Sequence, residues 1–166
     1  MALIIRDQSL YLCRMLKNIV PLSLPEPPLK LAKKEGQVVV WDPLRKKYLV
    51  LTPEEWVRQH LVYFLEQELG VPASAIALEG GFKLNQKQQR TDILVYKQTK
   101  PVLLVECKAP QVKISQATFD QAARYNLKYQ VDYFILSNGL TTIFTQVDHR
   151  QKTYHFLEKP PLFSQL

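Results

Sequence analysis

The feature of this sequence that most restricts its fold is an apolar run, Val102 to Val105, that ends directly in Glu106-Cys107-Lys108. A strand without polar positions is buried on both faces, so the run predicts a central strand of a sheet. Alternate residues of a strand share a face, so Glu106 and Lys108 point one way while Cys107 points into the core. Charged side chains rarely end a central strand without a reason, so this pair is a candidate functional site.

A second carboxylate, Asp92, begins the preceding apolar run at residues 92–96. The polar residues 97–100 indicate a turn, and in the resulting hairpin Asp92 lies beside Glu106. Two carboxylates supply the hard oxygen ligands that suit Mg²⁺, with Mn²⁺ as the alternative, and the backbone carbonyl of Cys107 is a further candidate ligand. Such a metal polarises a phosphate and acidifies a water, while Lys108 stabilises charge on the phosphate or orients that water.

The spacing of Asp92, Glu106 and Lys108 has a second explanation. Glu-x-Lys on a strand is commonly an exposed ion pair, and the three residues would then form a network that only supports the structure. The three histidines lack metal-ligand spacing and no Gly-x-Ser-x-Gly elbow occurs, so other common catalytic sets are poorly supported. Spacing alone does not decide between a metal site and an ion-pair network.

The rest of the sequence predicts an α/β protein with helices flanking a sheet. One helix begins at the cap Thr52, followed by Pro53 and by Glu55, which can complete a capping box, and it ends at Gly70. A second helix is predicted over residues 115–130. Runs of β-branched and aromatic residues predict further strands at 38–41, 48–51, 75–79, 133–136, 142–147 and 153–157, with a polar loop at 80–90.

The predicted domain occupies residues 31–158. Helical spacing at residues 7–20 and four prolines within residues 21–28 predict an N-terminal helix and an extended linker, which together make up residues 1–30. Residues 159–166 are predicted to be a tail.

Composition excludes several classes of function. The five glycines cannot form the phosphate loop G-x-x-x-x-G-K, so ATP is not an expected partner, and no apolar run approaches the roughly 18 residues of a membrane span. Two cysteines predict no disulfide framework and favour a cytoplasmic protein. The net charge is +7. Residues 83–128 hold nine basic and three acidic side chains, so nine minus three, or six, of these net positive charges lie in this region. The basic region therefore surrounds the candidate site and suits a polyanionic partner.

Five ordered segments across residues 45–140 resemble the PD-(D/E)xK nuclease superfamily and, within it, the N-terminal nuclease-like domain of type I restriction enzyme R subunits. Each segment is weak alone, and their order makes them specific. Thr91 stands where the motif name has proline. The segments are Arg45-Lys46-Lys47-Tyr48 with Thr52-Pro53-Glu54-Glu55-Trp56-Val57-Arg58-Gln59, Arg90-Thr91-Asp92-Ile93, Val105-Glu106-Cys107-Lys108-Ala109-Pro110, Phe119-Asp120-Gln121-Ala122-Ala123-Arg124-Tyr125-Asn126 and Ser137-Asn138-Gly139.

The resemblance implies a restriction-endonuclease-like α/β fold with a central mixed sheet flanked by helices. It implies Asp92 and Glu106 as metal ligands, Lys108 as the catalytic lysine, and a helix glutamate as a further ligand, with Glu55 preferred to Glu54.

The resemblance also points to residues near the nucleic-acid backbone. Gln121 and Tyr125 resemble a Gln-x-x-x-Tyr motif on one helical face beside the active site. Basic side chains are further candidates for contacts with phosphates, which give affinity rather than sequence choice: Lys83, Lys87, Arg90, Lys113, Arg124 and Lys128.

The sequence therefore predicts a Mg²⁺-dependent deoxyribonuclease related to restriction enzymes. DNA is the expected substrate, and a second copy of the chain or other restriction-system subunits are the expected protein partners. R subunits of this type carry a large motor after the nuclease, and none is expected within these 166 residues. The alternative is an inactive nuclease-fold module that binds nucleic acid or partner subunits.

Overall fold

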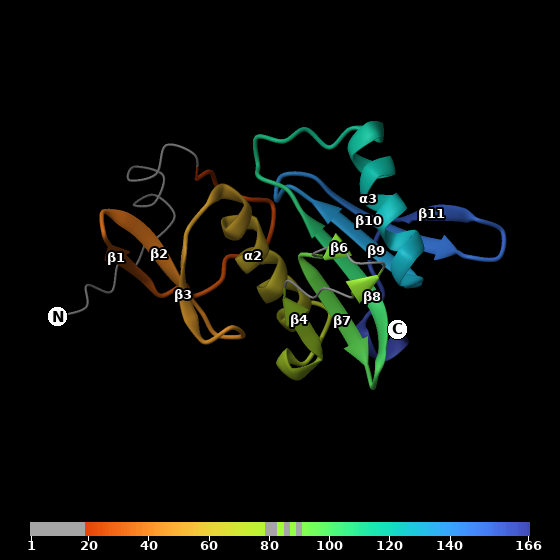
Figure 1. Cartoon of the computed structure of the whole chain (residues 1–166), viewed down its shortest axis with the longest axis horizontal. Coiled ribbons are helices and arrows are strands. Elements are labelled where there is room, and N and C mark those ends of the chain that lie inside the picture. The colour runs from red at the N-terminus through yellow and green to blue at the C-terminus, as the bar shows by residue number, and fades with distance from the viewer. Residues whose placement is uncertain (1–18, 79–82, 85–86, 89–90) are drawn as a thin grey trace.

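The computed structural model describes residues 19–166 except 79–82, 85–86 and 89–90. Its centre is a six-stranded sheet with the order β11-β10-β9-β8-β7-β4 (Figure 1). Strands β8 and β9 are parallel, and the other neighbours are antiparallel, so the sheet is mixed as predicted. The strands are β4 (Ile76–Leu78), β7 (Ile93–Lys97), β8 (Lys100–Cys107), β9 (Tyr133–Ser137), β10 (Thr142–Asp148) and β11 (Thr153–Leu157).

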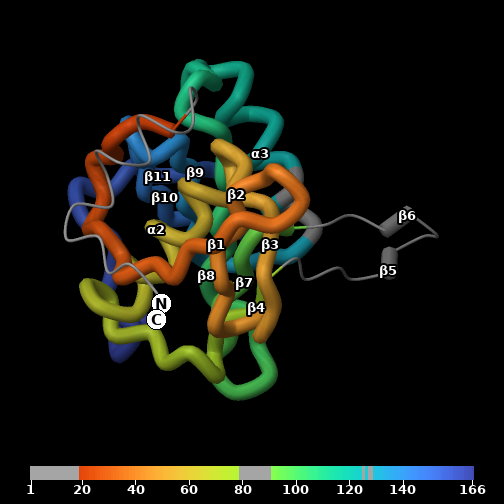
Figure 2. Tube along the Cα trace, turned by 90° about the vertical axis from the view of Figure 1, so that its left-hand side faces the viewer, coloured from red at the N-terminus to blue at the C-terminus, as the bar shows by residue number. Residues whose placement is uncertain are grey.

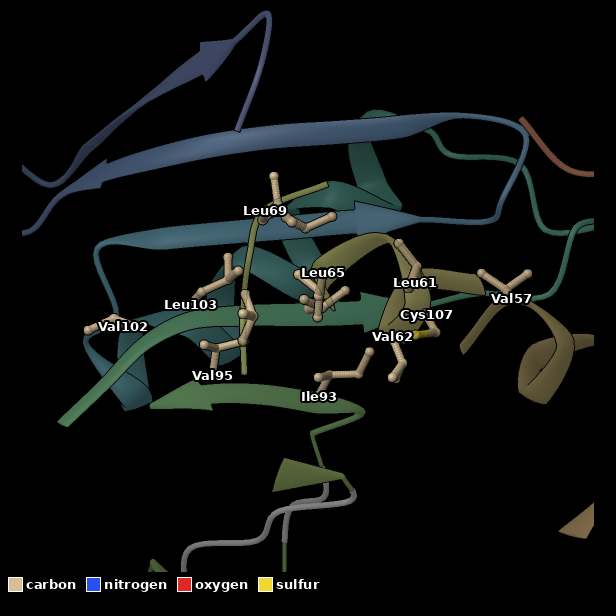
Figure 3. Packing of buried hydrophobic residues seen from close by; sticks show 13 residues of the cluster. Val57, Leu61, Val62, Leu65, Leu69, Ile93, Val95, Val102, Leu103 and Cys107 are labelled. Carbon is tan, nitrogen blue, oxygen red and sulfur yellow. The ribbon is translucent and has the colours of Figure 1, made fainter. Parts of the chain in front are cut away.

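One helix packs on each face of this sheet. Helix α2 (Pro53–Gln67) covers one face, where Leu61 and Leu65 pack with Ile93 and Leu103 (Figure 3). Helix α3 (Gln116–Tyr129) covers the other face, where Phe119 packs with the alternate strand residues, among them Leu94, Leu104 and Phe134. Residues 102–105 of β8 are buried on both faces, so the prediction of a central strand is confirmed. The α/β fold with a mixed sheet flanked by helices is therefore also confirmed.

Helix α2 begins where its capping residues predict. The Thr52 hydroxyl accepts a hydrogen bond from the Glu55 N–H at 3.1 Å, and Pro53 occupies the first turn. Gly70, at φ +69°, follows the helix end as expected. The second half of the predicted capping box does not form, because the Thr52 N–H donates to the Val50 carbonyl and the Glu55 carboxylate pairs with arginines instead.

A second, three-stranded sheet covers the opposite side of α2. It consists of β1 (Leu31–Lys34), β2 (Gln37–Asp42) and β3 (Lys47–Val50), and its core joins Val40 and Leu51 to Trp56 of the helix. The strands predicted at 38–41 and 48–51 are confirmed as β2 and β3, which pair antiparallel, whereas β1 was not predicted. The predicted loop at 80–90 contains a short strand pair, β5 (Lys83–Leu84) with β6 (Lys87–Gln88), while 3-10 turns occupy Ala73–Ala75 and Phe163–Gln165.

Residues 19–30 and 159–166, the described segments that flank the predicted domain, both pack onto it. The Ser23 N–H donates to the Gly139 carbonyl at 2.8 Å, and the indole N–H of Trp56 donates to the Val20 carbonyl at 3.0 Å. At the other end, the Phe163 N–H donates to the Leu69 carbonyl at 2.8 Å. Figure 2 shows the first described residues, in red, and the C-terminal residues, in dark blue, alongside the rest of the chain. The predicted helix at 7–20 falls almost wholly outside the described residues.

In the part of the chain that the structure describes, no helix is both long and apolar enough to cross a bilayer.

The packing of the N-terminal segment predicts a specific clash. Gly139 has φ +82°, and a methyl group added there would lie 2.7 Å from Leu22 Cδ2, whereas Gly36, at φ +79°, has no atom within 4 Å of that position. We expect Gly36→Ala to lower the free energy of unfolding by about 1 kcal/mol through backbone strain. Gly139→Ala has the same strain and also overpacks against Leu22, so its loss should be larger by about 1 kcal/mol or more.

Urea denaturation of both variants measures this difference, and Leu22→Ala in the Gly139→Ala background should restore part of the loss. Equal losses in the two glycine variants would mean that residues 19–30 do not hold the position described.

Candidate active site

The carboxylate of Asp92 lies at the junction of three elements. Asp92 immediately precedes β7, whose register pairs Ile93 with Val105, so Asp92 lies beside the end of β8. Its Oδ2 accepts a hydrogen bond from the Cys107 backbone N–H at 2.7 Å, and its Oδ1 accepts one from Arg58 Nη2 of helix α2 at 2.7 Å. The predicted position of Asp92 next to the Glu106–Lys108 segment is therefore confirmed.

Glu106 and Lys108 form a hydrogen-bonded ion pair at the end of β8. Lys108 Nζ donates to Glu106 Oε1 at 2.8 Å, and the Lys108 backbone N–H donates to the Ser137 carbonyl of β9 at 2.8 Å. Both side chains keep part of their surface exposed, 17% for Glu106 and 25% for Lys108, so a bound molecule can reach them. Cys107 points into the core as predicted, and burial raises the pKa of its thiol.

The charges around Glu106 leave an excess of negative potential. Burial raises the pKa of Glu106, and the carboxylates of Asp92 and Glu54 raise it further, against the lowering effect of Lys108. Burial opposes the charged form of Lys108, but its hydrogen bond to Glu106 and the three nearby carboxylates outweigh burial and raise the pKa of this ammonium. A cation placed between these carboxylates would relieve the repulsion that disfavours ionised Glu106.

Arg58 is the central cation of the site, and no sequence pattern singled it out. Its Nη2 contacts Asp92 Oδ1 and, at 3.1 Å, Glu54 Oε1, while its Nη1 donates to Glu55 Oε2. Burial disfavours the charged guanidinium, but the neighbouring Cys107, Asp92 and Glu55 groups prevail and raise the pKa of Arg58. Arg58 lies one helical turn after Glu54 and Glu55, on the same side of α2. This spacing is the only sequence signal that could have indicated Arg58.

The two helix glutamates have different surroundings. The buried Glu55 carboxylate accepts hydrogen bonds from Arg45, Arg58 and Gln59, and the same Arg45 and Gln59 side chains also donate to Asp42, at 2.7 and 3.0 Å. Glu54 instead keeps 48% of its side chain exposed and acts electrostatically on Glu106. Glu54 is thus the helix glutamate whose charge acts on Glu106, whereas the predicted ligand Glu55 is held by Arg45, Arg58 and Gln59.

Asp92 and Glu106 offer the carboxylate oxygens that Mg²⁺ binds, together with the backbone carbonyl of Cys107 between Glu106 and Lys108. Among the described residues, no set of three or more His, Cys, Asp or Glu side chains is arranged to hold a metal ion. Mg²⁺ is commonly bound through one or two carboxylates and keeps several waters, so a Mg²⁺ site does not require a third carboxylate.

Comparison with known proteins supports the resemblance that the motifs suggested. The family described as type I restriction enzyme R protein N terminus matches residues 53–161, which is more than half of the chain. The chain belongs to this family. The matched region contains α2, the six-stranded sheet and α3, and therefore every residue of the candidate site described above except Asp42 and Arg45.

A solved structure is similar to part of this chain. It is the fragment of a putative HsdR subunit of a type I restriction enzyme from Vibrio vulnificus YJ016, with 21% sequence identity and a TM-score of 0.48. The match covers 68% of this chain and 24% of that chain. No curated protein matches this chain significantly.

Several of the remaining predicted residues lie on α3 or just before it. Gln121, Arg124 and Lys113 are exposed, whereas Arg90 and the side chains of Tyr125 and Lys128 lie outside the described residues. The hydroxyl of Tyr129, one helical turn beyond Tyr125, forms a hydrogen bond with the Thr91 side chain and interacts electrostatically with Glu106. Sequence reasoning missed Tyr129, although its spacing of four residues from Tyr125 extends the same helical face.

Removal of the Arg58 guanidinium tests the ion-pair network. Arg58→Met leaves Glu55 and Asp92 without their shared cation in a buried position, so the free energy of unfolding should fall by about 3–5 kcal/mol. Lys100→Met removes an exposed cation 3.6 Å from Asp132 and should cost only about 0–1 kcal/mol. Urea denaturation at neutral pH measures both, and a similar small loss in the two variants would show that Arg58 is dispensable.

The raised pKa of Glu106 predicts a pH dependence. The folded protein holds the Glu106 proton more tightly than the unfolded chain, so its contribution to stability falls as pH rises from about 4.3 through the folded pKa. Glu106→Gln stays neutral, and its free energy of unfolding relative to wild type should rise over that window and then level off. Urea titrations across the acid to neutral range measure the difference, and one that falls as pH rises would contradict the environment assigned to Glu106.

Proposed function

We propose that this chain is a Mg²⁺-dependent nuclease domain that hydrolyses phosphodiester bonds in DNA. The observation that carries the proposal is the meeting of Asp92, Glu106 and Lys108 at the end of the central strand β8, in a member of the restriction enzyme R protein family. The order of the three residues fits the PD-(D/E)xK pattern with threonine in place of proline. DNA as substrate rests on the family and on the basic region around the site.

Asp92 and Glu106 are the metal ligands in this proposal, with the Cys107 carbonyl beside them. When bound, Mg²⁺ polarises a phosphate and acidifies a water for attack on phosphorus. The chain itself supplies orientation: the Cys107 N–H and Arg58 fix the two oxygens of Asp92, and Lys108 fixes one oxygen of Glu106. Lys108 can then transfer its hydrogen bond to a phosphate oxygen and stabilise the negative charge that develops there.

A second candidate function has support from one observation. Arg58 and Lys108 already give Asp92 and Glu106 cationic partners, so the carboxylates are stabilised without a metal. This arrangement suits an inactive nuclease-fold module that binds DNA or other subunits of a restriction system. The pKa of Glu106 nevertheless stays raised, first by burial and then by the charges of Asp92 and Glu54, so Lys108 does not fully compensate this carboxylate. A divalent cation beside Asp92 and Glu106 would supply the missing positive charge, which favours the metal-binding function.

Metal binding and DNA cutting separate the two functions. Calorimetry should detect Mn²⁺ or Mg²⁺ binding by the wild type and by Lys108→Met, but not by Asp92→Asn. Cutting of plasmid DNA should require metal and fall by about 100-fold or more in Lys108→Met, as expected when one group that stabilises the transition state is removed. Lys33→Met, an exposed lysine on β1, is the matched control and should cut like the wild type.

Metal-dependent cutting that persists in both Asp92→Asn and Lys108→Met would contradict the assignment of this site. DNA binding with neither metal affinity nor cutting would instead support the inactive module.

A further inference from the structure

A pocket of about 330 Å³ lies between α3 and the β10–β11 hairpin, away from the Asp92–Glu106 pair. Its volume is within the range of small-molecule sites. Figure 1 shows α3 beside these two strands. The register places Thr145 opposite both Phe134 and Phe156, so these side chains share the sheet face that α3 covers. The pocket has three parts of different chemistry: a polar floor, an aromatic wall and a cationic rim.

The floor contains two buried oxygens. Asn126 and Thr145 line the pocket and are each 2% exposed. Asn126 Nδ2 donates to the Val131 carbonyl at 3.2 Å, but within the described residues Asn126 Oδ1 and Thr145 Oγ1 have no hydrogen-bond partner. An amide oxygen accepts, and a hydroxyl both donates and accepts. A ligand that offers an N–H donor beside an acceptor would satisfy this floor.

Phe119 and Tyr154 line the wall, and the ring of Phe156 packs beside them. Phe119 of α3 lies 4.9 Å from Tyr154 and 5.3 Å from Phe156 between ring centroids, and the two β11 rings are 5.4 Å apart. Tyr154 and Phe156 keep 42% and 59% of their surfaces exposed on an edge strand. Exposed rings of this kind can stack on a flat aromatic ligand.

The rim carries a positive excess. Arg124 and Lys152 line the pocket mouth and are exposed, while the carboxylate of Asp120, the only acid among the lining residues, accepts a hydrogen bond from Gln116 at 2.7 Å. The two cations therefore favour an anionic ligand. A flat ring with adjacent donor and acceptor atoms, linked to an anionic group, is the chemistry of a nucleobase attached to its phosphate.

We propose that this pocket binds an unpaired nucleobase of a DNA strand, with its phosphate at Arg124 and Lys152. The proposal rests on the proposed nuclease function for its choice of DNA over a free nucleotide, which has the same chemistry. The base stacks against Tyr154. Asn126 Oδ1 and Thr145 Oγ1 are buried in the free protein and become hydrogen-bond partners of the base when it displaces the groups that cover the floor. The domain therefore prefers DNA that has single-stranded or extruded bases.

Fluorescence anisotropy in EDTA tests the pocket without cutting. The probe is a labelled oligothymidylate of about a dozen nucleotides, beside an abasic strand with the same number of phosphates. We expect oligothymidylate to bind more tightly than the abasic strand, and Tyr154→Ala to weaken its binding by about five- to 100-fold. Tyr48→Ala, a control with a similarly exposed ring on β3, should leave binding unchanged.

Thr145→Val separates recognition from folding. The Thr145 hydroxyl lacks a partner among the described residues, so its removal should not lower the melting temperature, but it should weaken oligothymidylate binding several-fold. Equal affinity for the abasic strand, or equal losses in Tyr154→Ala and Tyr48→Ala, would overturn the proposal. Thymidine monophosphate that competes as tightly as the oligonucleotide would overturn the choice of a DNA strand.

The two proposals fail in different ways. Normal oligothymidylate binding by a protein that neither binds metal nor cuts plasmid would leave the pocket standing and reject the nuclease. Metal-dependent cutting with no difference between oligothymidylate and the abasic strand would reject the pocket alone.

Discussion

The carboxylate of Asp92 has two structural partners, the backbone N–H of Cys107 at the end of β8 and the guanidinium of Arg58 on α2. These two contacts hold the start of β7 and the end of β8 against the helix, at the point where the apolar residues of β8 end. Arg58 is buried, and a buried guanidinium is tolerated only beside anionic partners. The position of α2 and the orientation of the proposed metal ligand therefore depend on the same ion pair, so stability and function are coupled at Asp92.

The ion-pair network extends beyond the region that matches the family. Glu55 joins Arg58 to Arg45, and Arg45 with Gln59 fixes Asp42 at the end of β2. The small N-terminal sheet thereby buries the outer side of α2, and all residues from 55 to 62 of that helix are buried. Because this sheet lies before residue 53, the environment of Arg58 depends on a part of the chain that the family match does not include.

Local chemistry explains which features the sequence could predict. The apolar run at Val102–Val105, the Thr52-Pro53 helix start and the β runs at 133–136 and 142–147 are each determined by neighbouring residues, and the structure has these elements in place. The contact between Arg58 and Asp92 joins residues 34 positions apart, and no periodic pattern specifies such a pair. Glu55 fits a capping box by spacing, but two arginines that approach from different elements compete for its carboxylate and prevail. The strand β1, Leu-Ala-Lys-Lys, has too little alternation to be predicted and forms because β2 pairs with it.

The charge balance explains how the residues of the proposed metal site can be stable in the fold without a metal. Among the described residues, five carboxylates and three cations make up these ion pairs, so the network keeps two excess negative charges when every carboxylate is ionised: Asp42, Glu54, Glu55, Asp92 and Glu106 with Arg45, Arg58 and Lys108. The cations stabilise the carboxylates in a partly buried place, which would otherwise destabilise the fold. The excess negative charge would favour a divalent cation in the proposed site. Arg58 contacts Asp92 Oδ1, an oxygen of the proposed metal ligand, so metal affinity would depend on how readily the guanidinium shifts toward Glu55 and Glu54.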